Sequence, residues 1–545
     1  MNSHVNGRTK LGLDVLETAL LMGVLGDELL RATPWGINVF VWTVALVAAT
    51  ARLLALARRS PGLWKENCWL LLPVVFFAAA FAWRDSPVLK LLNGLALLAA
   101  LSLIAWRARG RSILLAGVGE YILALIVAGR DAAFGCFPLL LRDVNWKEAV
   151  RPGWSRRAIR IARGLAIAVP LLLVFGGLFM AADAVFEGLV RNAFHFDLNN
   201  LYLHAFFIVF FTWTIGGYLR GMLTGKEVAG KSGLLKWCTL TTDTLQDGDN
   251  VATEDIKSDP KRPAFSPPSL GIIEIGIALG SLDLLFLCFV AVQIRYLFGG
   301  AAWVESSVGL TYAEYARRGF FELVTVAALA LFVLLVTHWL LLRSKNNSAS
   351  KHLFRVLATI QIILLFVIMA SAFVRMHLYQ REYGLTELRL YTTAFMVWLG
   401  LVFLWFAATA LRGRRERFAW GAMIAGFLIA GALQVANPDA LIVRANAAHA
   451  RAGRRFDAAY ATSLSADAVP ALVAVLPALN RHDRCIIASS VLTRWSGPGN
   501  MDWRAWSLSR TAAWRATREN ETDLRALVCP QRDAVENRGP QPTKE

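Results

Sequence analysis

A series of long apolar stretches is the feature that most constrains the fold of this chain. A helix needs about 20 apolar residues to cross roughly 30 Å of hydrocarbon, and soluble proteins have no use for so many helices that are apolar on every side. Composition agrees, because 56% of the residues are hydrophobic and the mean hydropathy is +0.48. The sequence therefore predicts an all-α, polytopic transmembrane helix bundle in a lipid bilayer. We expect about 11–12 spans, at 12–30, 35–56, 68–83, 87–106, 112–129, 160–182, 200–222, 270–297, 319–342, 353–374, 388–411 and 418–435.

Basic residues cluster in the segments beside these stretches, and the net charge is +18. Such placement is typical of cytoplasmic loops and headgroup contacts, so we expect no nucleic-acid partner. If every basic cluster is cytoplasmic, residues 112–141 begin and end on one side and form a re-entrant hairpin, interrupted at Gly135 and Pro138. The N-terminus is then cytoplasmic and the C-terminal tail extracytoplasmic. The alternative is about twelve simple crossings with both ends inside.

Two changes in composition divide the chain. The acids and prolines within residues 226–269 predict a flexible cytoplasmic loop. This loop separates two halves of a transmembrane bundle at 1–436. Residues 437–545 are less apolar and show helical periodicity, which predicts a small helical soluble tail domain. Cys485 and Cys529 both lie in this tail and could pair in an oxidising compartment.

Several strings along the chain are distinctive. The most specific is TYAEYARRGFFEL at 311–323, and the others lie at 181–186, 292–300, 375–379, 383–386, 437–439, 457–460 and 464–470. Together they resemble a bacterial polytopic membrane family known only as a domain of unknown function, numbered 4173 and related to the family numbered 4153. The resemblance implies an integral membrane protein without indicating an activity. We expect the bacterial cytoplasmic (inner) membrane.

Ionisable side chains at membrane depth are costly and therefore are candidates for function. In the predicted topology, one group of polar residues lies on the external side: Asp183, Gln293, Tyr312, Glu314, Tyr315, Arg318, Glu322, Arg375, Tyr379 and Arg389. Glu314 and Arg318 have the spacing of a helical ion pair, and Glu322 lies one turn further on the same face. We predict a shared polar site near the outer leaflet. The alternative is that the arginines snorkel to headgroups and the tyrosines form an aromatic belt.

Patterns typical of catalysis or metal binding are missing from the sequence. Histidines and cysteines lack metal-ligand spacing, so we predict no metal and no cofactor. Glu274 and Asp283 are on opposite faces of one predicted span, which excludes a paired carboxylate site on that helix.

Three functions remain open. Transport or permeation of a small molecule is favoured by many crossings and ionisable residues. A signalling or scaffold protein, with a sensing tail and a membrane protein partner, is the second. The third is an enzyme for a lipid-linked substrate. Asp27 and Glu28 lie near its expected catalytic loop, but residues 31–34 are too few to hold a sugar-phosphate, so we lean against it. A polar tunnel would favour transport, and fully paired charges a scaffold.

Overall fold

The computed structural model describes residues 7–57, 68–114, 116–146, 198–224, 272–298, 320–343, 348–412, 417–497 and 502–528. Within these ranges, every regular element is a helix. Seven helices are long and apolar enough to cross a membrane, or eight if a bent pair at Val118–Phe134 and Cys136–Asp143 counts as one span. The protein is therefore a multi-pass membrane protein with an all-helical fold, as the apolar stretches predict.

Each predicted span overlaps a helix, except for 160–182, which lies outside the described residues; the helices at 12–30, 68–83 and 319–342 are not among the seven or eight candidate spans. The first half contains α1 (Gly7–Leu30), α2 (Ile37–Leu56), η1 (Cys68–Leu70), α4 (Leu71–Trp83), α5 (Pro87–Ala108), α6 (Val118–Phe134), α7 (Cys136–Pro138), η2 (Leu139–Asp143) and α11 (Leu198–Thr224). The second contains α13 (Ile272–Phe298), α16 (Phe320–Arg343), α17 (Ser348–Tyr383), α18 (Glu387–Thr409) and α19 (Phe418–Ala436).

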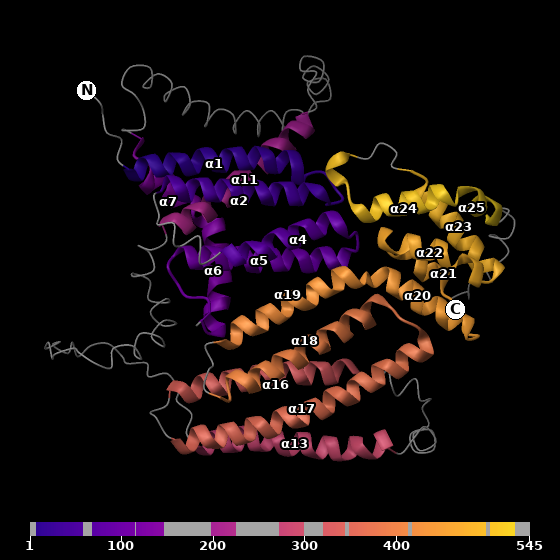
Figure 1. Cartoon of the computed structure of the whole chain (residues 1–545). Coiled ribbons are helices and arrows are strands. Elements are labelled where there is room, and N and C mark those ends of the chain that lie inside the picture. Colours follow the sequence, from indigo (N-terminus) through magenta and orange to yellow (C-terminus); the bar gives the residue numbers. More distant parts are fainter. Residues whose placement is uncertain are drawn as a thin grey trace, which may run out of the picture.

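Two groups of helices pack side by side, with α19 between them (Figure 1). In the first half, α1 and α11 share a core that includes Val15, Met22 and Leu219. In the second half, α13, α16, α17 and α18 pack around Leu279 and Leu365, both fully buried. Large apolar side chains on the outer faces stay exposed, as expected for helices that face lipid.

A bend interrupts the segment for which the sequence predicts a re-entrant hairpin. The two parts of the bent pair meet at 50°, and α6 runs across the direction of α4 and α5 at one end of the bundle (Figure 1). The bend lies at Gly135, where an added Cβ would come within 2.6 Å of the Gly217 carbonyl of α11. The 50° angle means that the segment is not one straight crossing helix. Glycine at the bend permits the close backbone contact with α11. The re-entry of the segment stays a prediction.

Buried acids held by arginines fasten this same end of the bundle. Asp143 is 2% exposed and pairs with Arg8 of α1, at 2.9 Å, and with Arg220 of α11. Asp131 of α6 pairs with Arg109 and, at 2.9 Å, with Arg130. The two Asp143 pairs join η2 to α1 and α11, and the Asp131–Arg109 pair joins α6 to the end of α5.

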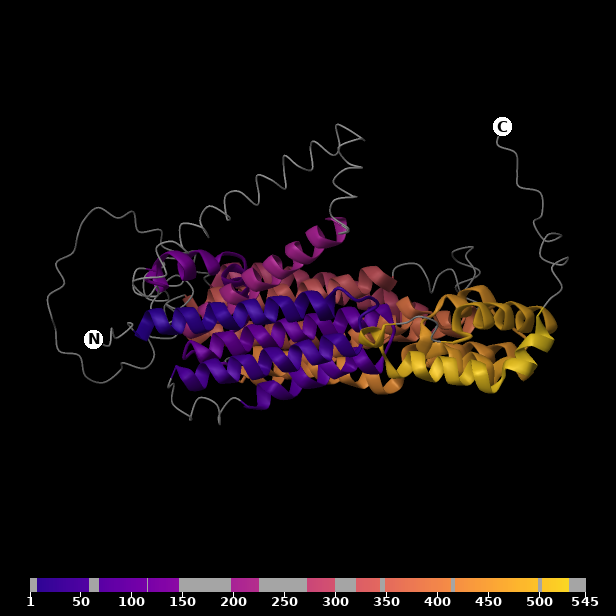
Figure 2. The same ribbon diagram turned by 90° about the horizontal axis from the view of Figure 1, so that it is seen from above.

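Shorter helices form the C-terminal region at the opposite end of the bundle (Figures 1 and 2). They share a core of their own that includes Ile442, Val469 and Ile487. Asn437 joins α19 to this region in a left-handed conformation (φ 52°), which asparagine tolerates better than most residues. The helices are α20 (Pro438–Arg451), α21 (Ala458–Ser463), η5 (Ala466–Ala468), α22 (Val469–Val475), η6 (Leu476–Ala478), α23 (Arg481–Trp495), η7 (Trp503–Ala505), α24 (Leu508–Glu519) and α25 (Glu521–Leu527).

Candidate functional site

Only part of the predicted outer-leaflet site can be located. Asp183, Tyr312, Glu314, Tyr315 and Arg318 lie outside the described residues, and the helix α13 is described at Gln293 without its side chain. The remaining members, together with Gln293, lie near helix ends at the end of the bundle that carries the C-terminal helices (Figure 1). Glu322 is exposed in the first turn of α16, and Arg375 is buried near the end of α17.

The structure brings Tyr379 and Arg389 together at the turn between α17 and α18. The Arg389 guanidinium lies over the Tyr379 ring, 4.0 Å from the ring centroid. The same guanidinium donates hydrogen bonds to the carbonyl oxygens of Tyr383, at 3.2 Å, and Gly384. Arg389 therefore stabilises the turn through cation–π attraction and by satisfying carbonyls at the end of α17.

The C-terminal region is hydrogen-bonded to this turn through Asn446 of α20. Its side-chain oxygen accepts a hydrogen bond from the Leu385 N–H at 2.6 Å, and its amide nitrogen donates to the Leu385 carbonyl at 2.9 Å. Gly384 precedes this contact with φ +76°, and an added Cβ would lie 2.7 Å from the Asn446 oxygen. Glycine is required here by both backbone conformation and space.

A second and larger junction is centred on Asp467 of η5, whose side chain is 1% exposed. Its carboxylate accepts hydrogen bonds from the backbone N–H groups of Asp85, at 2.6 Å, and Ser86, at 3.0 Å. Arg84 pairs with it at 3.2 Å, and the Ser509 hydroxyl donates to the same oxygen. The carboxylate thus binds the turn between α4 and α5 and joins it to two C-terminal helices, η5 and α24.

A neighbouring group of charges extends the junction. Asp85 pairs with Lys90 at 2.6 Å and with Arg510 of α24. Arg510 is buried and also donates to the Ala505 carbonyl at 2.7 Å. Because these opposite charges lie together away from water, removing one partner would leave another buried and unpaired.

Asp439 of α20 also lies at the junction, but only one of its carboxylate oxygens accepts hydrogen bonds from described residues. Its Oδ2 accepts hydrogen bonds from the backbone N–H of Ser465, at 3.2 Å, and from the Ser465 hydroxyl. Its Oδ1 is buried without a hydrogen-bond partner among the described residues. Burial raises the pKa of the Asp439 carboxyl to about 6, and the nearby acids Glu387 and Asp467 add to this rise.

A different polar centre lies at the mid-depth of α13 and α17 in the second half. Asp283 is 7% exposed and lies near the middle of the candidate span Ile273–Val292. Neither of its carboxylate oxygens has a hydrogen-bond partner in the described part of the chain. Gln361 of α17 is fully buried, and both of its amide atoms are also without a described partner. By contrast, Glu274 on the same helix as Asp283 is exposed, as expected from their opposite faces.

Asp283 and Gln361 lie at matching depths on adjoining helices. An added Cβ on Gly276 would lie 3.6 Å from Leu353, so these two residues mark one level of the α13–α17 contact. Both helices begin at the same end of the bundle (Figure 1), and Asp283 and Gln361 each follow their marker by about two turns. The structure therefore places two buried polar groups without described partners at the same depth of the bundle.

An apolar groove lies among the described residues of the first half. The groove, of about 540 Å³, lies between α6 and α11 and is lined by apolar side chains such as Phe206, Phe210 and Trp213. Its lining residues include no carboxylate.

Sequence reasoning did not identify the two polar centres as sites. Asp467 lies within one of the distinctive strings, 464–470, but nothing in that string shows that its carboxylate meets the turn at Asp85. Asp283 is visible as an acid within an apolar span, and the signal that could have ranked it higher is its central position. Its missing partners are a property of the packed structure.

Comparison with known proteins identifies a family for most of the chain. Residues 71–475 match the family model described as Domain of unknown function (DUF4153). The model that matches is the one numbered 4153, rather than the related family numbered 4173 that the distinctive strings resemble. No curated protein and no solved structure matches the chain. Because the match spans most of the bundle and the start of the C-terminal region, the chain belongs to the DUF4153 family.

Proposed function

We propose that this protein transports a small molecule across the bilayer and that the movement is coupled to proton binding at Asp283. The observation that carries this proposal is the buried carboxyl group in the middle of α13, without a described hydrogen-bond partner. An isolated ionised carboxylate at membrane depth is costly unless it takes up a proton or a cation. Carboxyl groups in this position serve as proton relays in membrane transport.

Gln361 supports this role because its amide can both donate and accept hydrogen bonds. A movement of α13 against α17 that brought the two side chains into contact would let the amide donate to ionised Asp283 or accept from its protonated form. The pair therefore offers two hydrogen-bonding arrangements that differ by one proton. A two-state element of this kind is what coupling between proton binding and helix movement requires.

The outer-leaflet site remains part of the proposal as the mouth of the pathway. Glu322, Arg375, Tyr379 and Arg389 supply charge and aromatic rings at one end of α16, α17 and α18, in the same half of the bundle as Asp283. The other proposed members are Asp183, Gln293, Tyr312, Glu314, Tyr315 and Arg318. A polar mouth at the end of the helices and a buried carboxyl at mid-depth fit a small polar or charged solute.

The disulfide chemistry of the C-terminal region supports the proposed orientation. Cys485 of α23 is disulfide-bonded, and we propose Cys529, the other cysteine of the tail, as its partner. Disulfides persist in oxidising compartments such as the bacterial periplasm. We therefore propose that the C-terminal tail is extracytoplasmic, that the N-terminus is cytoplasmic and that the protein resides in the bacterial cytoplasmic membrane.

A flux assay tests the role of Asp283. The full chain is reconstituted into liposomes that contain a pH-sensitive dye, and proton entry is followed after a membrane potential is imposed. The wild type should conduct protons above the level of empty liposomes, and Asp283→Asn should reduce this flux by at least about tenfold. Glu274→Gln is the matched control, because Glu274 lies on the same helix but is exposed, and it should retain the flux. Equal flux in wild type and Asp283→Asn, or no flux above empty liposomes, would contradict proton coupling.

The paired charges of the junction favour a second function, that of a signalling or scaffold protein. Asp467, Asp85 and Arg510 hold the C-terminal region firmly on the bundle, which would pass a change in the tail directly to α4 and α5. Complementation of a deletion strain separates the two functions, with membrane levels checked by immunoblot. Rescue by Asp283→Asn but not by Asp467→Asn would favour a scaffold, and the reverse pattern would favour transport.

A further inference from the structure

Three side chains meet at the end of the first half that faces the C-terminal helices. They come from two helices that are far apart in sequence but packed together. Asp27 and Glu28 lie in the last turn of α1, and His204 lies in α11. One ligand atom from each of the three residues lies within 4.8 Å of the others. His204 Nδ1 is already in contact with the Asp27 carboxylate.

Close packing of α1 against α11 brings the three residues together. An added Cβ on Gly23 would lie 2.0 Å from the Thr212 hydroxyl, and one on Gly26 would lie 2.9 Å from the Phe211 ring. Helices that approach so closely leave side chains at the next turn in direct contact. The position of His204 beside Asp27 therefore follows from the helix packing, and both residues are held by rigid elements.

The state of Asp27 points independently to a missing ligand. Its side chain is only 2% exposed, yet its Oδ1 is buried without a hydrogen-bond partner among the described residues. The nearest described cation to that oxygen is the Arg31 guanidinium, whose Nε lies 4.0 Å away, beyond hydrogen-bond distance. A buried carboxylate oxygen beside other potential metal ligands is unfavourable unless a cation or donor satisfies it.

The surrounding charges permit a cation to enter. Glu28 is 61% exposed, which provides a route from solvent. Arg504 of η7 contacts the Glu28 carboxylate at 3.4 Å, but it pairs more closely with Asp502, at 2.5 Å. Arg504 would therefore keep a partner if Glu28 turned to a metal. The two acids also lie at the negative end of the α1 helix dipole, where positive charge is stabilising.

We propose that Asp27, Glu28 and His204 form a binding site for a divalent transition-metal cation, with Zn²⁺ as the best match. One imidazole and two carboxylates suit Zn²⁺ better than Ca²⁺ or Mg²⁺, which prefer oxygen ligands alone. Three protein ligands leave a fourth tetrahedral position open to water or a solute. The site joins α1 to α11 and lies beside the Arg504 contact with the C-terminal region, so metal binding would stabilise this part of the molecule. Metal binding at this site does not depend on proton coupling at Asp283.

Metal binding is measured on the full chain in detergent, purified without a histidine tag and stripped with a chelator. Zn²⁺ affinity is determined by competition with a chromogenic chelator. The wild type should bind one ion per chain, and His204→Gln should weaken binding by at least about tenfold. His377→Gln is the matched control, because His377 is exposed on α17, and it should bind like the wild type.

Arg504→Gln provides a second readout that does not depend on losing a ligand. This variant removes a positive charge beside Glu28 and should strengthen Zn²⁺ binding, by about tenfold. Zn²⁺ should also raise the thermal unfolding temperature of the wild type but not of His204→Gln. Absence of Zn²⁺ binding by the wild type, equal affinity in His204→Gln, or no gain in Arg504→Gln would overturn the assignment.

Discussion

Asp467 and Asp283 are both buried carboxyl groups, yet their surroundings are opposite. Asp467 accepts hydrogen bonds from two backbone N–H groups, an arginine and the Ser509 hydroxyl. Asp283 has no hydrogen-bond partner among the described residues. The first arrangement is what structural stability requires, because the charge is fully compensated. The second is unfavourable in the resting structure, and such groups are retained where function needs them.

The largest expected effect is at the satisfied acid. Asp467→Ala should lower the free energy of unfolding by about 3–5 kcal/mol, because Arg84 and the amides of Asp85 and Ser86 lose their acceptor. Denaturant unfolding in detergent, followed by tryptophan fluorescence, measures this change. Asp523→Ala is the control, since Asp523 is exposed on α25, and it should change stability by less than about 0.5 kcal/mol. Similar losses in both variants would show that the junction does not stabilise the protein.

Asp439 should make the stability depend on pH. Its pKa is raised to about 6 from the ordinary 3.8, so the ionised form is disfavoured in the folded protein. The stabilisation from the protonated form is fully present below about pH 4 and is lost as the pH rises through about 6. The free energy of unfolding should fall by up to about 3 kcal/mol across this range relative to Asp439→Asn. Identical pH profiles for the wild type and Asp439→Asn would contradict this assignment.

Asp283 should respond in the opposite direction from Asp467. Asp283→Leu keeps the branching of the side chain and removes a buried carboxyl without a described partner. It should raise the free energy of unfolding by roughly 1–2 kcal/mol while abolishing proton flux. Thermal unfolding in detergent together with the liposome assay tests both parts. A loss of stability like that of Asp467→Ala would erase the contrast between the two acids.

Gly384 tests how tightly the turn between α17 and α18 is held. Gly384→Ala should cost about 1–2 kcal/mol, because the left-handed backbone and the Asn446 contact both oppose a Cβ. Gly453 has a similar φ of +86° but open space around it, so Gly453→Ala reports the backbone term alone. Equal losses in the two variants, measured by chemical unfolding, would mean that Asn446 adds nothing at this position.

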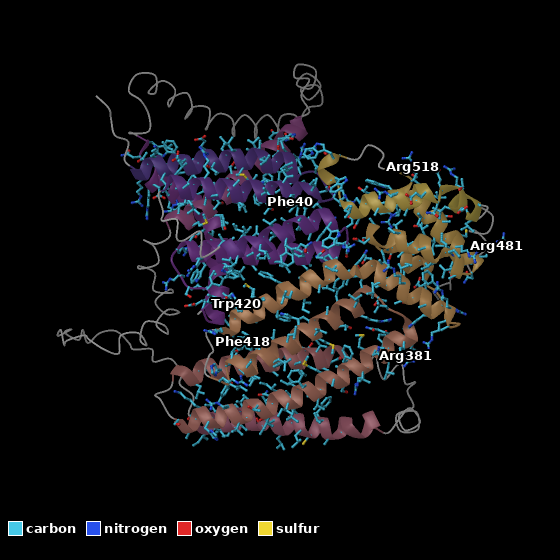
Figure 3. The ribbon with its side chains drawn as sticks, in the orientation of Figure 1. Phe40, Arg381, Phe418, Trp420, Arg481 and Arg518 are labelled. Atoms are coloured by element: carbon cyan, nitrogen blue, oxygen red, sulfur yellow. The ribbon has the colours of Figure 1, made fainter. Side chains whose placement is uncertain are left out.

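Arg389 should have the smallest effect on stability. Its cation–π contact is partly exposed, and Arg389→Gln should lower the free energy of unfolding by about 0.5–1 kcal/mol. Arg381 is exposed in the last turn of α17 (Figure 3). Arg381→Gln is therefore the control and should leave the free energy of unfolding nearly unchanged. A loss above about 2 kcal/mol would show that Arg389 makes further contacts.

Much of the fold could be predicted because lipid imposes a simple rule on sequence. Residues 388–411 are predicted as a span and form α18 at Glu387–Thr409, since apolar length alone defines a transmembrane helix. The interruption near Gly135 and Pro138 is likewise visible as glycine and proline within an apolar segment. Contacts between helices could not be predicted in this way. The pairing of Tyr379 with Arg389 depends on how the chain turns at Gly384.

The candidate metal site likewise depends on a contact between helices that the sequence does not predict. Spacing along the chain predicts no metal site, because motif reasoning finds ligands that lie near one another in sequence. Asp27 and His204 are far apart in sequence and meet only because glycines let α1 and α11 approach closely.

The sequence by itself determined that this protein crosses a membrane many times as helices and ends in a less apolar helical region. Hydrophobicity is a local property, and the bilayer reads it segment by segment. Only the tertiary structure decided which buried charges are satisfied and which are not. The partners of Asp467 come from distant segments, and the lack of a partner for Asp283 among the described residues depends on how α13 packs.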